Sequence, residues 1–419
     1  MGSNTRNQKL KKFSIAFLTL SILTSFITQT FGEGGILSRI TVADMFGTVA
    51  FIVFIGLNKF YSSSGYRAAF FIVFAFAIGL FQTASLGQTL TELLVLLFLV
   101  FSSIMTYSVY RTPEGFIQLI NLVVYTSLIT SFFGFYGFVA MATGLPNIFP
   151  GRASGEIMSG FRNAGQAGAF ILVFLTILMP FNFSTATQLL TKKQKLLLNV
   201  AIYSLIIFLF LTAKIAAYIG FAFCIIFSAA QRRKYGYVFL ILIVSGVIAL
   251  LWENLDSIAP AVYTRINAKI ETRITNNLND ENDLDDSFIA KNFGEAIDVF
   301  VEHPITGAGI GGFQGVYARH EVHSTYFKII GETGTAGVIA YSIFIILLVS
   351  NLLGLSKEKK ISPYADFLWN LKPFFFGCMV SWFYTYHLRK REFWIMFAVI
   401  AIASYLRKNT SFTRLQEPE

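Results

Sequence analysis

His323 is the residue whose type and setting in this chain most readily suggest chemistry. It is followed by Glu332 and Gly334, and it stands between a polar stretch at 253–322 and a long apolar run. An imidazole can hold or remove the proton of a substrate hydroxyl near neutral pH. A histidine placed where water meets a membrane is therefore a candidate for chemistry on a lipid-borne substrate.

Basic residues near His323 in the expected topology are candidates for binding phosphate. Those expected on the same side of the membrane as His323 are Arg152, Arg162, Lys214, Arg265, Lys269, Arg273, Lys291 and Arg319. Their charges suit phosphate groups and would stabilise a diphosphate leaving group. Long basic side chains also extend from a membrane toward its surface for purely structural reasons, so this alternative stays open for each of them.

Metal and cofactor motifs are weak. His320 and His323 could form half of a zinc site, but no further ligand has suitable spacing. The acidic cluster at 280–286 does not follow the calcium-loop spacing and is better interpreted as solvated surface. The glycines at 307–312 follow a helix–proline turn rather than a strand, so we expect close backbone approach there rather than dinucleotide binding. We expect no metal and no cofactor.

The composition is that of a membrane protein. The chain is 55% hydrophobic and 16% aromatic, with only 13% charged residues, and apolar runs long enough to cross a bilayer recur along it. The formal net charge is +10, but most basic residues fall in short loops between apolar runs, which excludes nucleic-acid binding as the explanation. We predict an all-α, polytopic membrane protein.

About twelve transmembrane helices are expected. Their ranges are 13–31, 40–57, 68–86, 89–110, 116–143, 163–183, 196–212, 214–230, 236–252, 335–355, 365–386 and 393–406. The chain then divides into helices one to nine at 1–252, a periplasmic loop carrying the histidine at 253–334, and helices ten to twelve with a cytoplasmic tail at 335–419. Cys224 and Cys378 fall inside expected spans and are interpreted as buried thiols.

The basic loops predict the orientation. With the first apolar run retained as a helix, the lysine and arginine clusters alternate in a way that places both termini in the cytoplasm. The 253–322 loop then faces outward, and an amphipathic helix at 288–301 ends at Pro304. The cluster Arg389-Lys390-Arg391 falls on the outer side, against this rule. Either the helix count fails there, or an anionic lipid or diphosphate partner holds the cluster outside.

Two motifs together resemble a known family. The turn from His303 to Phe313 has a Pro-x-x-Gly-x-Gly pattern, and His323-Ser-Thr-Tyr is followed by Glu-x-Gly-x-x-Gly at 332–337. This combination is similar to the O-antigen ligase and O-antigen polymerase superfamily. The segment Gly160-Phe-Arg-Asn163 also resembles the family's sixth span. The chain departs from the family in having Lys214 and Ile289 where arginines are usual.

The resemblance implies a membrane glycosyltransferase that is independent of metal. Such enzymes move a glycan from an undecaprenyl-diphosphate carrier to an acceptor hydroxyl, at the periplasmic face of the bacterial inner membrane. The acceptor is lipid A–core in a ligase or another carrier-linked glycan in a polymerase. His323 matches the functional histidine of the family.

The remaining roles follow from the same resemblance. Candidate ligands of the donor diphosphate are Lys214, Arg162, Lys291 and Arg273. Supporting candidates are Glu332, Arg152, Arg319 and His320. A transporter or flippase of lipid-linked glycans is the alternative. It predicts paired charges at mid-membrane and internal repeats, whereas the sequence shows no clear repeat and most mid-span positions are apolar.

Overall fold

The computed structural model of the 419-residue chain describes most of the sequence. The described residues are 2–29, 40–56, 60–61, 63–149, 159–212, 214–232, 260, 263–264, 267, 288–314, 316–317, 322–355 and 362–414. Within these ranges the secondary structure is helical, which confirms the all-α class.

The helices fall into three stretches of the chain. The N-terminal stretch contains α1 (Gly2–Leu23), α2 (Val42–Ile55), α3 (Ser64–Ile78), the short η2 (Gly79–Phe81), α4 (Leu86–Tyr110) and α5 (Pro113–Thr143). The middle stretch contains α6 (Ala164–Phe183), the short η3 (Thr185–Leu189), α7 (Lys192–Leu211) and α8 (Ile215–Arg232). The last contains α13 (Phe288–Glu302), α14 (Thr325–Ser350), α15 (Pro363–Ser381) and α16 (Arg391–Arg414).

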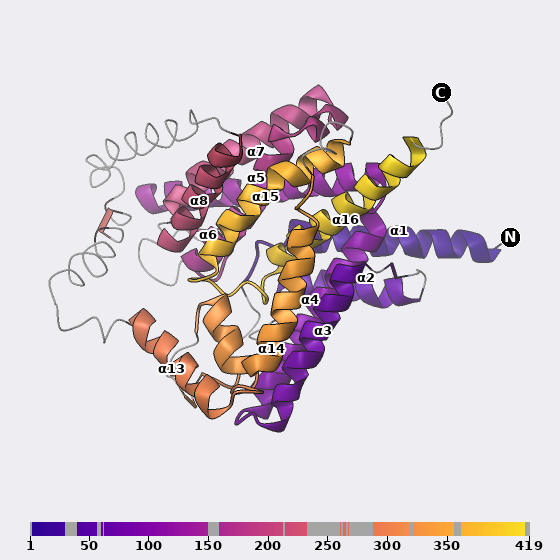
Figure 1. The fold of residues 1–419 in the computed structure, drawn as a ribbon. Helices are drawn as coiled ribbons and strands as arrows, with labels where there is room; N and C mark the ends of the chain where they lie inside the picture. The colour runs from indigo at the N-terminus through magenta and orange to yellow at the C-terminus, as the bar shows by residue number, and fades with distance from the viewer. Residues whose placement is uncertain are drawn as a thin grey trace.

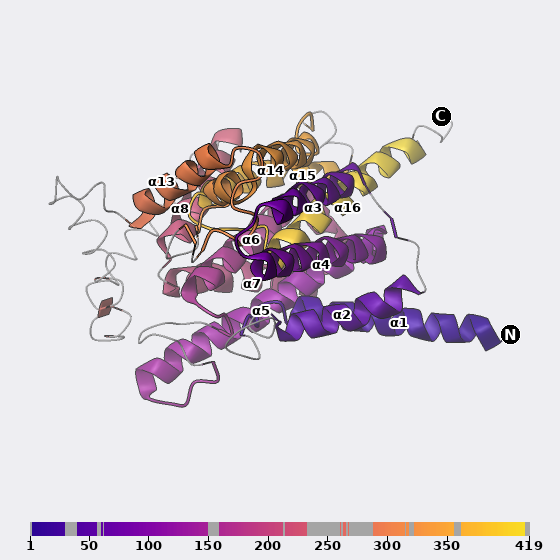
Figure 2. The same ribbon diagram turned by 90° about the horizontal axis from the view of Figure 1, so that it is seen from below.

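Helix α6 lies at the centre of the bundle. Its side chains from Ala167 to Phe181 are all buried, and it packs against α5, α7, α8, α15 and α16. Figure 2 shows α1, α2 and α5 along one side and α14 and α15 along the other, with α6 between them. A helix that is apolar around its whole circumference suits such a central position.

The outer helices expose apolar side chains. Ile52 on α2, Leu94 on α4 and Phe132 on α5 are each more than 60% exposed. Among the described residues, seven helices are long and apolar enough to cross a membrane: α4, α5, α6, α7, α8, α14, and α3 together with η2. An apolar exterior of this kind suits contact with lipid, so the chain is a multi-pass membrane protein.

The ends of the chain lie on the same side of the bundle. The first residues of α1 and the last residues of α16 both point away from α13 (Figures 1 and 2). The side of the membrane that each end of the bundle faces stays a prediction.

Eleven of the expected helices have a counterpart in the structure, and the twelfth, 236–252, lies outside the described residues. The amphipathic helix expected at 288–301 is α13. The helix expected at 335–355 is the part of α14 that follows the bend at Gly334 (φ 58°), and the residues from Thr325 to the bend form a preceding helical part. The twelve-span count and the division into 1–252, 253–334 and 335–419 stay predictions.

Candidate active site

His323 lies directly before α14. Its side chain is exposed, whereas the neighbouring Ser324 is buried and caps the helix by accepting a hydrogen bond from the Phe327 N–H. A serine whose hydroxyl accepts from the first turn is a favourable helix start. The exposed imidazole therefore stands on a defined helix terminus rather than on an unrestrained loop.

The segment between α15 and α16 holds that terminus in place. The Thr325 N–H donates to the Trp382 carbonyl (2.8 Å), and the Thr325 hydroxyl donates to the Thr385 carbonyl (2.6 Å). The same hydroxyl accepts a hydrogen bond from the His387 N–H (3.1 Å). Thr325, two residues after His323, thus ties the start of α14 to the 382–387 loop.

Glu332 is buried in the first turns of α14. Its carboxylate pairs with Lys328, with 3.2 Å between Nζ and Oε1, and both side chains are at most 2% exposed. The other oxygen, Oε2, accepts a hydrogen bond from the Gly311 N–H at 2.7 Å. The Lys328 ammonium also lies over the Tyr386 ring, 4.6 Å from its centroid. Glu332 is consequently a clamp between the helix and the glycine-rich turn, and it lies away from solvent.

The glycine-rich turn packs tightly against the bend in α14. Gly307, Gly309 and Gly311 all have positive φ (58°, 80° and 76°). A side-chain carbon added at Gly307 would lie 2.5 Å from the Gly331 carbonyl oxygen. The Ala308 N–H donates to that same oxygen at 2.9 Å. The close backbone approach expected for these glycines is confirmed.

The turn also contacts the first half of the chain. A side-chain carbon at Gly79 would lie 2.8 Å from the Gly309 Cα, and one at Gly311 would lie 2.8 Å from the Glu92 Cγ. Glu92 in turn accepts a hydrogen bond from Arg389 at 2.8 Å. The turn is therefore fixed from three directions: α14, the α3–α4 junction and α4.

Two predicted cations lie near the start of α6. Asn163 caps this helix by accepting from the Gln166 N–H (2.9 Å), and the Arg162 N–H donates to the Thr28 hydroxyl (2.7 Å). Lys214, which precedes α8, packs across the same turn: a side-chain carbon at Gly165 would lie 3.4 Å from its Nζ. The helix N-terminus adds its own partial positive charge to that of Lys214 and Arg162.

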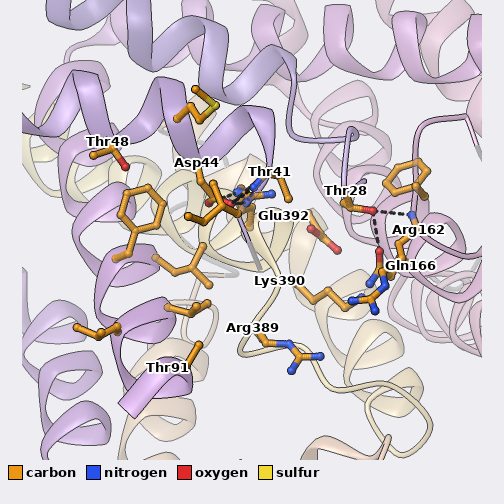
Figure 3. Close-up of a pocket in the computed structure, with 18 of the residues that line it drawn as sticks. Thr28, Thr41, Asp44, Thr48, Thr91, Arg162, Gln166, Arg389, Lys390 and Glu392 are labelled. Carbon is orange, nitrogen blue, oxygen red and sulfur yellow. Dashed lines mark hydrogen bonds and ion pairs between the residues drawn. The ribbon is translucent and has the colours of Figure 1, made fainter. Parts of the chain in front are cut away.

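Arg162 also lines a pocket of about 530 Å³ between α2, α4 and the start of α16. The same pocket is lined by the basic cluster whose expected outer position is contrary to the positive-inside rule, Arg389, Lys390 and Arg391. Figure 3 shows Lys390 extending toward the side of the pocket where Arg162 and Gln166 lie. His323 and Lys214 are not among the lining residues.

The other predicted site residues are less informative. Lys291 lies on α13, where only its backbone is described, and Arg152, Arg273, Arg319 and His320 fall outside the described residues. Cys224 and Cys378 are free and buried, as expected. Within the described residues, no group of three or more His, Cys, Asp or Glu side chains is arranged to hold a metal ion.

Sequence reasoning missed the carboxylates that organise the basic cluster. Asp44 on α2 pairs with Arg391, whose Nε lies 3.1 Å from Oδ1, and Glu92 on α4 pairs with Arg389. Both acids fall within apolar runs of the sequence, where an ionisable side chain is costly without a partner. That cost was the signal that could have identified them.

Comparison with known proteins agrees with the resemblance. Residues 200–342 match the family model described as O-Antigen ligase, so the chain resembles the O-antigen ligase and polymerase superfamily over this segment. The segment contains Lys214, the glycine-rich turn, His323 and Glu332. No curated protein matches the chain.

Proposed function

We propose that this chain, whose residues 200–342 match the O-antigen ligase family, is a glycosyltransferase that uses a lipid-linked glycan. The donor is a glycan on an undecaprenyl-diphosphate carrier, and the acceptor is a hydroxyl of lipid A–core or of another carrier-linked glycan. The reaction takes place at the periplasmic face of the bacterial inner membrane.

The position of His323 carries this proposal. It is an exposed imidazole at a capped helix start, inside the segment that matches the family model. An acceptor hydroxyl can reach an exposed nitrogen, whereas the buried Glu332 is covered by the glycine-rich turn. His323 is therefore the catalytic candidate, and Glu332 and Lys328 are positioning residues.

The chemistry requires one proton acceptor and one leaving-group site. The oxygen of the acceptor hydroxyl attacks the anomeric carbon of the donor sugar, and His323 accepts the proton that this hydroxyl loses. The bond from that carbon to the diphosphate oxygen breaks, and the carrier diphosphate leaves with the electron pair. Lys214 and Arg162 at the start of α6 stabilise the diphosphate charge, with Lys291 and Arg273 as further ligands from the outer segment.

The test is transfer by purified protein in detergent with a carrier-linked glycan. His323→Ala should lower the rate by at least about a hundredfold, because removal of a positioned general base costs roughly 10²–10⁴. His323→Gln keeps a hydrogen-bonding group without a usable base and should be nearly as slow. Full activity in both variants, with a normal unfolding temperature, would refute the role of His323.

Variants of Lys214 provide an independent test of the proposed donor site. Lys214→Ala should lower transfer strongly, and Lys214→Arg should retain most of it because the charge at the α6 start is kept. Lys193→Gln, at the exposed start of α7, is the control for loss of one positive charge. An arginine variant as slow as the alanine variant would indicate a packing role only.

The acceptor is identified in the same assay. Reactions with and without lipid A–core separate the two activities: chain extension without core indicates a polymerase, and transfer only to core indicates a ligase. Products are resolved by gel mobility and by mass.

A further inference from the structure

Helix α13 carries a line of apolar side chains on its outer surface. Ile297 and Val301 are four positions apart and so share one side of the helix, and Ile305 follows just beyond its end. These three side chains are 47%, 72% and 65% exposed, respectively. Branched apolar side chains aligned in this way, at this exposure, indicate a surface that meets something other than water.

The face of α13 that packs on the protein is separate from this apolar line. Ala296 and Val299 are buried, and a side-chain carbon at Gly331 of α14 would lie 3.0 Å from the Ala296 Cα. The Phe293 ring stacks on the Phe327 ring of α14, with the two centroids 4.0 Å apart. The buried face therefore has α14 as its partner, and the apolar line is left for a different one.

Acidic side chains form a flank on the other side of the apolar line. Asp298 and Glu302 are exposed, and they follow Ile297 and Val301 by one position each, which places them about 100° further round the helix. Helix α13 thus presents a buried face, an apolar line and an acidic flank in turn. Exposed apolar and charged sectors side by side are typical of a helix that lies in the plane of a membrane–water boundary.

The apolar line is continuous with a surface that faces lipid. Past the bend in α14, Thr335, Ile339 and Ile343 are exposed at intervals of four positions, so they mark one outer face of this membrane-crossing helix. The Thr335 hydroxyl donates a hydrogen bond to the Pro304 carbonyl at 2.7 Å, and Ile305 follows Pro304 directly. The lipid-facing side of α14 therefore begins where the apolar line of α13 ends.

The direction of α13 fits this continuity. Figure 1 shows α13 lying across the lower end of α14, whereas α14 and α3 run side by side along the bundle. Because α3 with η2 and α14 are long and apolar enough to cross the membrane, a helix that lies across their ends is near the bilayer surface.

We propose that α13 is an interfacial helix that docks on the bilayer surface through Ile297, Val301 and Ile305. Its partner is the boundary between the lipid headgroups and their acyl chains, and the acidic flank faces the water. Anionic lipid would repel that flank, so a zwitterionic bilayer is sufficient. Through its buried face α13 then holds the start of α14, and with it His323, at a fixed height relative to the bilayer. The docking requires only that the chain spans a membrane, and it does not require glycan transfer.

Labels on two neighbouring residues test the docking. Val301→Cys or Glu302→Cys carries a nitroxide spin label in protein reconstituted in phosphatidylcholine nanodiscs. The readout is collision of the label with oxygen, which concentrates in the bilayer, or with a water-soluble nickel chelate. The Val301 label should lie about 5–10 Å into the boundary between headgroups and acyl chains, and the Glu302 label should lie in water. Unaltered protein, in which Cys224 and Cys378 are buried, measures the background labelling.

Two outcomes of this experiment would overturn the proposal. Equal access of the nickel chelate to both labels would show that the apolar line is in water. A Val301 label that neither reagent reaches would show that protein, rather than lipid, covers the line.

A charge introduced into the apolar line tests why the helix docks. With the spin label at Ile305→Cys, the added change Val301→Asp should move the label into water, because a carboxylate enters the acyl boundary only at a cost. Glu302→Gln, on the acidic flank, is the matched control and should leave the depth of the label unchanged. An Ile305 label that keeps its depth when Val301→Asp is present would contradict docking through this line.

The unaltered protein provides the measurement if a variant folds poorly. A phosphatidylcholine with a carbene precursor near the start of its acyl chain is activated in the same nanodiscs, and the labelled peptides are identified by mass. Label on 297–305 as well as on the exposed face of α14 at 339–346 supports the docking. Label on 339–346 without label on 297–305 would overturn it. Because no step here depends on turnover, failure of the docking and failure of the transferase proposal are distinguishable.

Discussion

The Gly311 N–H donates a hydrogen bond to the Glu332 carboxylate at 2.7 Å, across 21 positions of sequence. This contact joins the glycine-rich turn to the Glu-x-Gly-x-x-Gly stretch. The glutamate keeps the turn against α14, and its second oxygen neutralises the buried Lys328.

Removing that carboxylate should destabilise the protein. Glu332→Gln leaves the buried Lys328 ammonium without its counter-charge, and loss of one partner of a buried ion pair costs about 3–5 kcal/mol. The unfolding temperature in detergent measures the loss. A double variant, Lys328→Met with Glu332→Gln, should recover part of it, and a double variant as unstable as the single one would contradict this account.

The bend at Gly334 should admit no side chain. Its φ of 58° with ψ of −159° is a glycine conformation, and an added carbon would lie 2.6 Å from the Ile305 carbonyl carbon. Gly334→Ala should therefore cost at least about 1–3 kcal/mol of unfolding free energy. Gly87→Ala in α4, where no atom lies within 4 Å of the new carbon, is the control and should be neutral or stabilising by about 0.5–1 kcal/mol. Equal effects at the two glycines would refute the steric argument.

Stability should fall in mild acid because of His387. Burial, with a smaller contribution from the charge of Lys390, holds the pKa of this imidazole well below its usual 6.5. The unfolded chain therefore binds a proton that the folded protein does not, so stability present above pH 6.5 is lost as the pH falls toward the folded pKa. Unfolding temperatures at pH 7.5 and 5.5 measure the slope.

The matched variant for this pH effect is His387→Gln, which cannot titrate. Its unfolding temperature should depend less on pH than that of the unaltered protein. An unchanged slope would assign the pH dependence to other groups.

Thr325 should position His323 for transfer. Thr325→Val keeps the shape of the side chain but removes the hydroxyl that bonds the Thr385 carbonyl and the His387 N–H. We expect transfer to fall about tenfold, because a catalytic group displaced by a fraction of an ångström loses rate. Thr325→Ser restores the hydroxyl and should restore the rate. A serine variant as slow as the valine variant would indicate a purely structural role.

The helices and the motif-bearing segment could be predicted from the sequence, because apolar runs and glycine–proline turns are local signals. The contacts of the site could not. Arg389 and Glu92 are 297 positions apart, and their pairing depends on how α4 and the α15–α16 loop pack. The sequence indicated a cation cluster in an unexpected place; the structure gives it Asp44 and Glu92 as partners and Arg162 as a neighbour.

The bend in α14 likewise depends on contacts between segments that are distant in the sequence. The apolar run predicts a helix from 335, and α14 does resume there after the bend at Gly334: the Thr335 and Ala336 N–H groups donate to the Pro304 and Ile305 carbonyls, whereas Ser324 caps the first part of the helix at Thr325. Propensity and hydropathy describe a single segment, whereas the carbonyls that accept from these two N–H groups belong to a partner segment 31 residues earlier in the chain.

The glycine-rich turn rests on Gly79 and Glu92, and the start of α14 is tied to the 382–387 loop. All three supports lie outside the segment 200–342 that matches the family model. That segment is accordingly not a portable module. A chimera that exchanges it between related proteins would have to carry α3, η2, α4 and the α15–α16 connection with it, or the helix that bears the exchanged histidine would lose these three supports.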